Sequence, residues 1–223
     1  MKSTVSAYER LGALPPVFRG AELTVRFQWT SKTASHYLYL WKRRGLVESL
    51  GGHSDVFANL VVCREPDWEA ALRLSMPSAV LTGVEVLRRA GWTTQIPFRP
   101  EVTVNSAEPV YQVEHFDVKA RPPGWFKLLA PGICRSQARG PSTLSPGWAL
   151  AEMIRSEGWG ACGLTPDDIY WDEVSDQDRV DWAQACEQLG LGEIAMNPDE
   201  DGDRSRCRWR TLASQSVALN TSF

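Results

Sequence analysis

Four polar or charged side chains recur at helical spacing between residues 31 and 44. They are Lys32, His36, Tyr39 and Arg43. If this segment is a helix, they share one face, because each lies three or four residues from the next. Lysine and arginine suit phosphates or guanine edges, while histidine and tyrosine can hydrogen-bond to bases or to the backbone. These residue types therefore indicate recognition of nucleic acid.

The same segment carries an apolar face opposite the polar one. Its members are Ala34, Leu38 and Trp41, with Tyr37 at the border. Thr30 or Ser31 is suited to cap the helix N-terminus, and Gly45 is suited to end the helix in a left-handed conformation. The pattern predicts a helix from about Ser31 to Arg44 that is anchored on a small core by its apolar side.

The neighbouring segments favour a known DNA-binding arrangement. We expect helices over residues 4–13 and 20–28, then two short strands over 46–51 and 56–61 around a turn at 52–55. This order is typical of a winged helix-turn-helix, in which one helix enters the DNA major groove beside a hairpin. The predicted DNA-binding residues are Ser31, Lys32, Thr33, His36, Tyr39, Lys42, Arg43, Arg44 and His53. The alternatives are an ordinary solvated helix face and, for His53, a plain turn residue.

Charge is distributed unevenly along the 223 residues. Residues 1–60 carry a net charge of +4, residues 151–200 carry −11, and the whole chain carries −3. A basic segment joined to an acidic body is typical of a nucleic-acid module with a separate domain, although acidic residues also serve solubility. No apolar run approaches the ~20 residues that a membrane span needs. The N-terminus, interrupted by Glu9 and Arg10, does not resemble a signal peptide, so we expect a cytoplasmic protein.

The rest of the chain predicts a mixed domain. Helices are expected at 67–74, 78–90, 146–157, 166–174 and 175–189, and strands between 95 and 130, including residues 124–129. We therefore predict an α+β protein with a winged helix-turn-helix at 1–64 and a mixed α/β C-terminal domain at 65–195. Residues 196–223 are expected to be a polar segment followed by a tail or an edge strand.

Catalytic or metal-binding patterns are scarce. The five cysteines are widely spaced without a CxxC motif, and the three histidines are scattered, so we predict reduced thiols, no metal site and no cofactor. One short pattern, Glu101 followed by Asp117-x-Lys119 on the next expected strand, could hold Mg²⁺ and cleave a phosphodiester. A solvated strand face explains it more simply, and we do not expect an enzyme.

Two later segments resemble a known family. The first echoing set is Ala79, Thr82, Gly83, Leu87, Gly91, Trp92 and Thr93. The second is Ser145, Pro146, Trp148, Ala149, Leu150, Ala151 and Glu152. Together with the N-terminal pattern, which ends in WKRRGLVE, they resemble the AbiEi antitoxins of type IV toxin–antitoxin systems, also described as regulators of viral defence. The resemblance covers most of residues 5–190, and the segment after residue 195 has no counterpart in it.

This resemblance implies a function. It implies a repressor that binds inverted repeats of double-stranded DNA in its own promoter through the winged helix. It further implies a C-terminal domain that counteracts a nucleotidyltransferase toxin, which such antitoxins are generally thought to do without forming a stable complex. The alternatives are a ligand-responsive winged-helix transcription factor without a toxin partner and a Mg-dependent nuclease that uses Glu101, Asp117 and Lys119.

Overall fold

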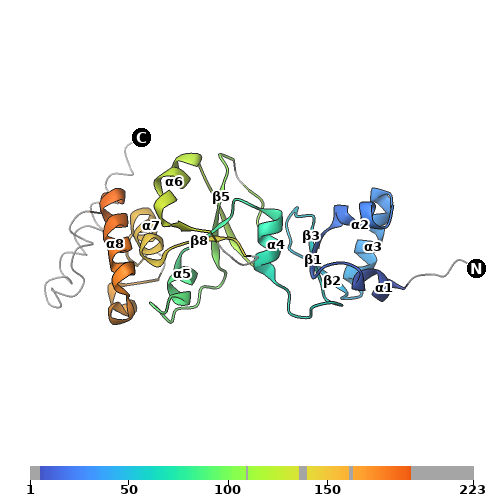
Figure 1. The fold of residues 1–223 in the computed structure, drawn as a ribbon, viewed down its shortest axis with the longest axis horizontal. Helices are drawn as coiled ribbons and strands as arrows, with labels where there is room; N and C mark the ends of the chain where they lie inside the picture. The colour runs from blue at the N-terminus through green and yellow to red at the C-terminus, as the bar shows by residue number, and fades with distance from the viewer. Residues whose placement is uncertain (1–5, 109, 136–139, 161–162, 192–223) are drawn as a thin grey trace, which may run out of the picture. The chain divides into compact units, whose positions relative to one another are not determined.

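A computed structural model describes residues 6–108, 110–135, 140–160 and 163–191 (Figure 1). The predicted tail at 196–223 lies outside the described residues. Helices and β-strands are both present, so the predicted α+β class is confirmed. The chain divides into two compact units. The first comprises residues 1–80, 102–122 and 135–142, and the second comprises 81–101, 123–134 and 143–223.

The N-terminal part of the first unit contains three helices and three strands. In chain order they are α1 (Ala7–Gly12), β1 (Val17–Arg19), α2 (Gly20–Arg26), α3 (Ser31–Arg43), β2 (Val47–Ser49) and β3 (Val56–Asn59). The strands form an antiparallel sheet in the order β1-β3-β2, with Val17 opposite Ala58 and Val47 opposite Asn59. The predicted helix and hairpin segments are confirmed, whereas β1 was not predicted.

Apolar side chains from these elements meet in one core. Its buried members are Leu11, Leu14, Phe18, Leu23, Ala34, Leu38, Trp41 and Val47. Helix α3 contributes Ala34, Leu38 and Trp41, which are three or four positions apart and therefore lie on one face that is removed from water. Because α2 and α3 share this core with the sheet, the packing fixes where α3 lies (Figure 1).

One buried amide ties the sheet to the segment that precedes it. Asn59 is fully buried, and its Nδ2 donates to the carbonyl oxygen of Leu11 at 2.8 Å. Longer hydrogen bonds of 3.4 Å reach the carbonyl oxygens of Leu14 and Pro15. The backbone N–H of Val61 donates to Asn59 Oδ1. A single side chain therefore satisfies backbone groups in the segment before β1 and in the segment after β3.

A second sheet has five strands in the order β6-β5-β4-β8-β7. They are β4 (Val80–Thr82), β5 (Glu101–Asn105), β6 (Asp117–Arg121), β7 (Ile133–Cys134) and β8 (Ser142–Leu144). Helix α4 (Trp68–Ser75) belongs to the first unit, and Asp67 caps it, with its carboxylate accepting from Ala70 N at 2.9 Å.

Three predicted elements are wrong, and one of them is the helix expected at 166–174, which is instead two short 3-10 helices, Pro166–Asp168 and Trp171–Glu173. The helix expected at 78–90 is strand β4 followed by the short helix α5 (Val84–Arg89). Gly83 separates them with a φ of 72°, a left-handed value that a continuous helix cannot contain. The segment 124–129, expected as a strand, lies instead almost entirely in helix α6 (Pro123–Leu128), where Pro123 supplies a φ already suited to a first helical turn.

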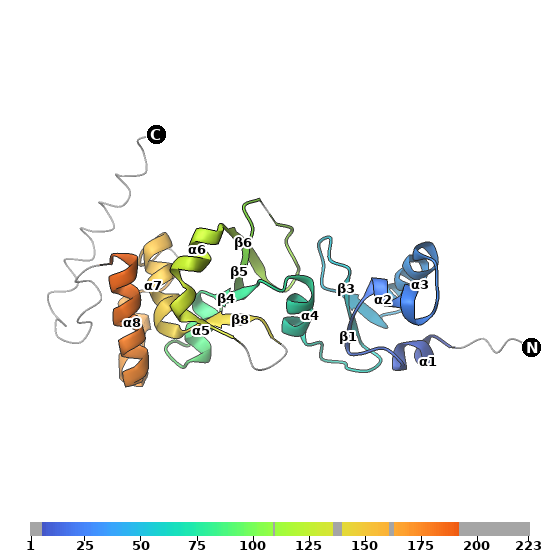
Figure 2. The same ribbon diagram turned by 45° about the horizontal axis from the view of Figure 1, so that its top comes forward.

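The second unit is built around two long helices, α7 (Pro146–Glu157) and α8 (Asp176–Leu189), which lie side by side (Figure 1, Figure 2). A side-chain carbon on Gly147 would lie 2.6 Å from the backbone nitrogen of Trp182, so glycine permits this close approach. Burial raises the pKa of the Cys186 thiol in α8 to about 12, so it stays protonated and packs as an apolar group.

Three short 3-10 helices occur in the described residues, at Ala130–Gly132, Pro166–Asp168 and Trp171–Glu173. No helix in the described ranges is long and apolar enough to cross a membrane.

Asn59→Ala is expected to lower the free energy of unfolding by about 2 kcal/mol, because it leaves buried carbonyl groups without a donor. Urea titration followed by tryptophan fluorescence measures the change. Asn105→Ala, at an exposed position that ends β5, is the control and should change stability by less than about 0.5 kcal/mol. Equal effects of the two substitutions would show that the buried amide has no special role.

Candidate nucleic-acid interface

Helix α3 divides into the two faces that its sequence predicts. Ala34, Leu38 and Trp41 are buried, and Tyr37 is half-buried at the border. The predicted outward side chains are all exposed: Lys32, His36, Tyr39 and Arg43. Tyr39 keeps 58% of its surface accessible, which is unusual for an aromatic side chain beside a core. The two predicted faces are confirmed, and the DNA-binding role of the exposed one stays a prediction.

The first turn of α3 is capped by side-chain hydroxyl groups. Thr30 caps the helix, and its Oγ1 accepts from the backbone N–H of Thr33 at 3.2 Å. The Oγ1 atoms of Thr30 and Thr33 also lie 2.9 Å apart. The hydroxyl of Thr33 is therefore engaged within the cap, while Ser31 and Lys32 are exposed. Of the three residues predicted at the helix start, Ser31 and Lys32 are the better placed to contact a ligand.

An aromatic cluster fixes the turn between α2 and α3. Trp29 stacks on Tyr37 with 4.4 Å between ring centroids and lies 4.9 Å from Phe27. The guanidinium of Arg10 lies 5.1 Å from the ring centre of Trp29 and 5.0 Å from that of Tyr37, which is cation–π geometry. Gln28, just before Trp29, has a φ of 54°. This cluster holds the chain in a tight reversal and so sets the direction of α3.

The C-terminal end of α3 concentrates positive charge. Lys42, Arg43 and Arg44 are all exposed, and α3 contains no acidic residue. The guanidinium of Arg43 lies 5.8 Å from the ring centre of Tyr39, so these two exposed side chains are neighbours. Gly45, with a φ of 64°, ends the helix as predicted. The charged residues of the exposed face, Lys32 at its start and Lys42, Arg43 and Arg44 at its end, are therefore all cationic and can attract phosphate groups.

The turn of the β2–β3 hairpin is covered by residues 111–114 of the same unit. The backbone N–H of Glu114 donates to the carbonyl oxygen of Leu50 at 3.2 Å. Gly51 and Gly52 have φ values of 97° and 58°. A side-chain carbon on Gly52 would lie 2.3 Å from the carbonyl oxygen of Gln112. Glycine is therefore required here both for its backbone conformation and for the close approach.

Side chains continue this contact around the turn. Ser54 Oγ lies 3.1 Å from Ser75 Oγ, which lies 2.8 Å from the hydroxyl of Tyr111. The ring of His53 meets Tyr111 edge-on with 6.4 Å between centroids, and His53 remains exposed. The predicted contact residue His53 thus lies on a hairpin turn that is packed against its own unit.

The three residues of the nuclease alternative lie on two strands, Glu101 on β5 and Asp117 and Lys119 on β6. Glu101 is half-buried and accepts a hydrogen bond from Thr82 Oγ1 at 3.1 Å. Asp117 is exposed at the start of β6, and Lys119 is half-buried in the middle of that strand. Glu101 has a structural task in holding Thr82, and the predicted role of these three residues in Mg²⁺ binding stays a prediction.

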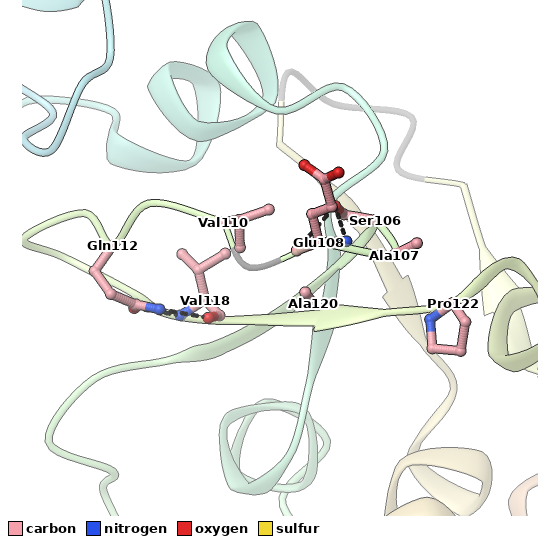
Figure 3. Close-up of a pocket in the computed structure, with 8 residues that line it drawn as sticks. All are labelled: Ser106, Ala107, Glu108, Val110, Gln112, Val118, Ala120 and Pro122. Atoms are coloured by element: carbon pink, nitrogen blue, oxygen red, sulfur yellow. Dashed lines mark hydrogen bonds between the residues drawn. The ribbon is translucent and has the colours of Figure 1, made fainter.

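A pocket of about 560 Å³ lies along β6 (Figure 3). Its lining residues are Ser106, Ala107, Glu108, Val110, Gln112, Val118, Ala120 and Pro122. The side-chain amide of Gln112 donates to the carbonyl oxygen of Val118 and accepts from the N–H of Val118, at 2.6 and 3.0 Å. The lining is mostly apolar, and Glu108 is its one ionisable residue. This arrangement suits a small apolar ligand better than acid–base catalysis.

Three possible metal ligands meet beside the hairpin. Glu48 of β2 joins Glu114 and His115, and one ligand atom from each lies within 4.8 Å of the others. Sequence spacing could not reveal this group, because Glu48 is far along the chain from the other two. The aromatic cluster around Trp29 was missed for a similar reason, since its packing produces no local periodicity.

No protein-family model matches the chain, and no curated protein sequence matches it. Functional assignment therefore rests on the residues and geometry of the chain itself.

Gly52→Ala should lower the free energy of unfolding by about 2 kcal/mol or more, because the added carbon meets Gln112 as well as requiring a positive φ. Gly45→Ala is the matched control. Its φ is also positive, but no atom lies within 4 Å of the added carbon, so its cost should be about 1 kcal/mol. Thermal unfolding compares the two variants. If Gly45→Ala costs as much, the contact between the hairpin and residues 111–114 contributes nothing.

Proposed function

We propose that residues 1–64 form a winged helix-turn-helix that binds double-stranded DNA through α3. The observation that carries the proposal is an exposed helix face whose charged residues, Lys32, Lys42 and Arg43, are all cationic, opposite a buried face. The arrangement of α2, a tight turn, α3 and an antiparallel hairpin supports it, because this is the order of elements in that DNA-binding motif.

The exposed residues of α3 suit different parts of a DNA site. Ser31 and Lys32 occupy the helix start, where recognition helices most often reach base edges, and His36 lies one turn further along. Lys42, Arg43 and Arg44 are arranged to neutralise phosphates at the other end of the helix. Because the hairpin turn packs against residues 111–114, we assign most of the binding energy to α3 and a backbone contact to His53.

We further propose that the protein is a cytoplasmic antitoxin that represses its own operon and counteracts a nucleotidyltransferase toxin. The support is the resemblance to AbiEi antitoxins. Most of the matching residues in the second unit are structural: Trp148, Ala149, Leu150 and Ala151 are buried in α7, and Gly83 and Gly91 have positive φ. The resemblance therefore bears on the fold of this unit and leaves open whether it touches the toxin.

A ligand-responsive repressor without a toxin is the second candidate. One observation favours it: Gln112 lines the pocket along β6, and its carbonyl oxygen also packs against Gly52 of the hairpin turn. A small molecule in this pocket would contact a residue that touches the proposed wing. A ligand that changes DNA affinity in the wild type, with Gln112→Ala abolishing that change, would favour this candidate.

Lys32→Ala and Arg43→Ala should each weaken binding to the DNA upstream of the gene about tenfold, or ~1.4 kcal/mol. If each residue neutralises one phosphate, each substitution should also reduce the slope of log affinity against log salt by about 0.9. Gel-shift titrations at several salt concentrations measure both quantities, with unrelated DNA of equal length for comparison.

Lys127→Ala is the matched control for the DNA experiment. Lys127 is also an exposed helical lysine, but it lies in α6 of the second unit. Its substitution should leave affinity and salt slope unchanged. Wild-type affinity and slope in both α3 variants would contradict the proposed interface.

Co-expression with the product of a neighbouring nucleotidyltransferase gene tests the antitoxin proposal. The wild type should restore growth and repress a reporter fused to its own promoter. Because the two activities are assigned to different parts of the chain, Lys32→Ala should lose repression and keep the growth rescue when expressed from an unrelated promoter. Failure of the wild type to restore growth would remove the antitoxin assignment and leave DNA binding unaffected.

A further inference from the structure

Glu114 and His115 are presented together by a tight turn. Val113 and Phe116 form an isolated antiparallel bridge, and both are buried. The two residues between them are therefore held at the tip of a reversal whose base is anchored. The N–H of Glu114 bonds to Leu50 O, which brings this tip beside the end of β2.

The imidazole of His115 is fixed in orientation. It stacks on Trp68 with 3.8 Å between ring centroids and an interplanar angle of 18°. Its Nε2 atom is shielded from solvent and has no hydrogen-bond partner among the described residues. A buried polar nitrogen without a partner is costly, so its presence indicates that another group satisfies it in the functional protein.

Carboxylates face this nitrogen. Nε2 lies 3.8 Å from Glu48 Oε1, which is too long for a hydrogen bond but suits two atoms that share a metal ion. Around a tetrahedral zinc ion with bonds of ~2.05 Å, neighbouring ligand atoms are ~3.3 Å apart. The three atoms already lie within 4.8 Å of one another, and Glu114 is exposed, so its side chain is free to turn inward.

We propose that Glu48, Glu114 and His115 bind a divalent transition-metal ion, with Zn²⁺ as the best match. An imidazole nitrogen favours zinc over magnesium and calcium, which prefer oxygen ligands alone. Two carboxylates balance the charge of the ion, and a water molecule completes a four-coordinate site. The ion joins β2 to the turn at 113–116, both in the first unit, and supplies the partner that Nε2 lacks.

Isothermal titration of the chelator-treated, reduced full chain with ZnCl₂ tests this site. His115→Ala and Glu48→Gln should each lose one equivalent of zinc relative to the wild type. Glu114→Gln should weaken binding at least about tenfold. Glu65→Gln, another exposed glutamate of the first unit outside the group, is the matched control and should bind zinc as the wild type does.

Cobalt absorption separates this site from the cysteines. Co²⁺ at a site of one histidine and two glutamates should give visible bands that His115→Ala removes, without the near-ultraviolet band of thiolate coordination. Circular dichroism of each metal-free variant checks the fold. Glu114→Gln keeps the experiment decisive if His115→Ala unfolds, because Glu114 is exposed.

The proposal is overturned if the wild type binds no zinc. It is also overturned if folded His115→Ala and Glu114→Gln bind as the wild type does, or if the cobalt bands are those of thiolates alone. These outcomes do not depend on whether α3 binds DNA.

Discussion

The direction of α3 depends on how Trp29 packs. This ring lies between Phe27 and Tyr37, with Arg10 over it, at the point where the chain reverses between two helices. Aromatic packing of this kind is rigid, since the rings have few rotatable bonds and large contact areas. The exposed face of α3 keeps one direction because the buried face is fixed in this way. The core packing and the proposed DNA contacts therefore use different side chains on opposite sides of one helix.

Local patterns were sufficient to predict this part of the chain. The helix is 13 residues long, its apolar residues recur at helical spacing, and its cap and stop residues are conventional. The short apolar run at Val80–Thr82 gave no such guidance, because a buried strand and a buried helix are equally apolar. Only the positive φ of Gly83, which depends on tertiary structure, separates strand from helix there.

Contacts between distant segments could not be predicted. The approach of Gln112 to Gly52 and the meeting of Glu48 with His115 are set by how residues 110–116 fold back across the first unit. The sequence marks Gly52 as a turn residue and contains no signal for what covers it. As a result, the candidate interface on α3 could be predicted from local spacing, whereas the metal-ligand group beside the hairpin required the three-dimensional structure.

The amide of Gln112 has a further consequence for β6, which is the terminal strand of its sheet. By bonding to both the N–H and the carbonyl oxygen of Val118, this side chain imitates one residue of an adjoining strand. Exposed strand edges invite pairing with other chains and can seed aggregation. One glutamine thus blocks that edge at its second residue, an economical form of protection against unwanted self-association.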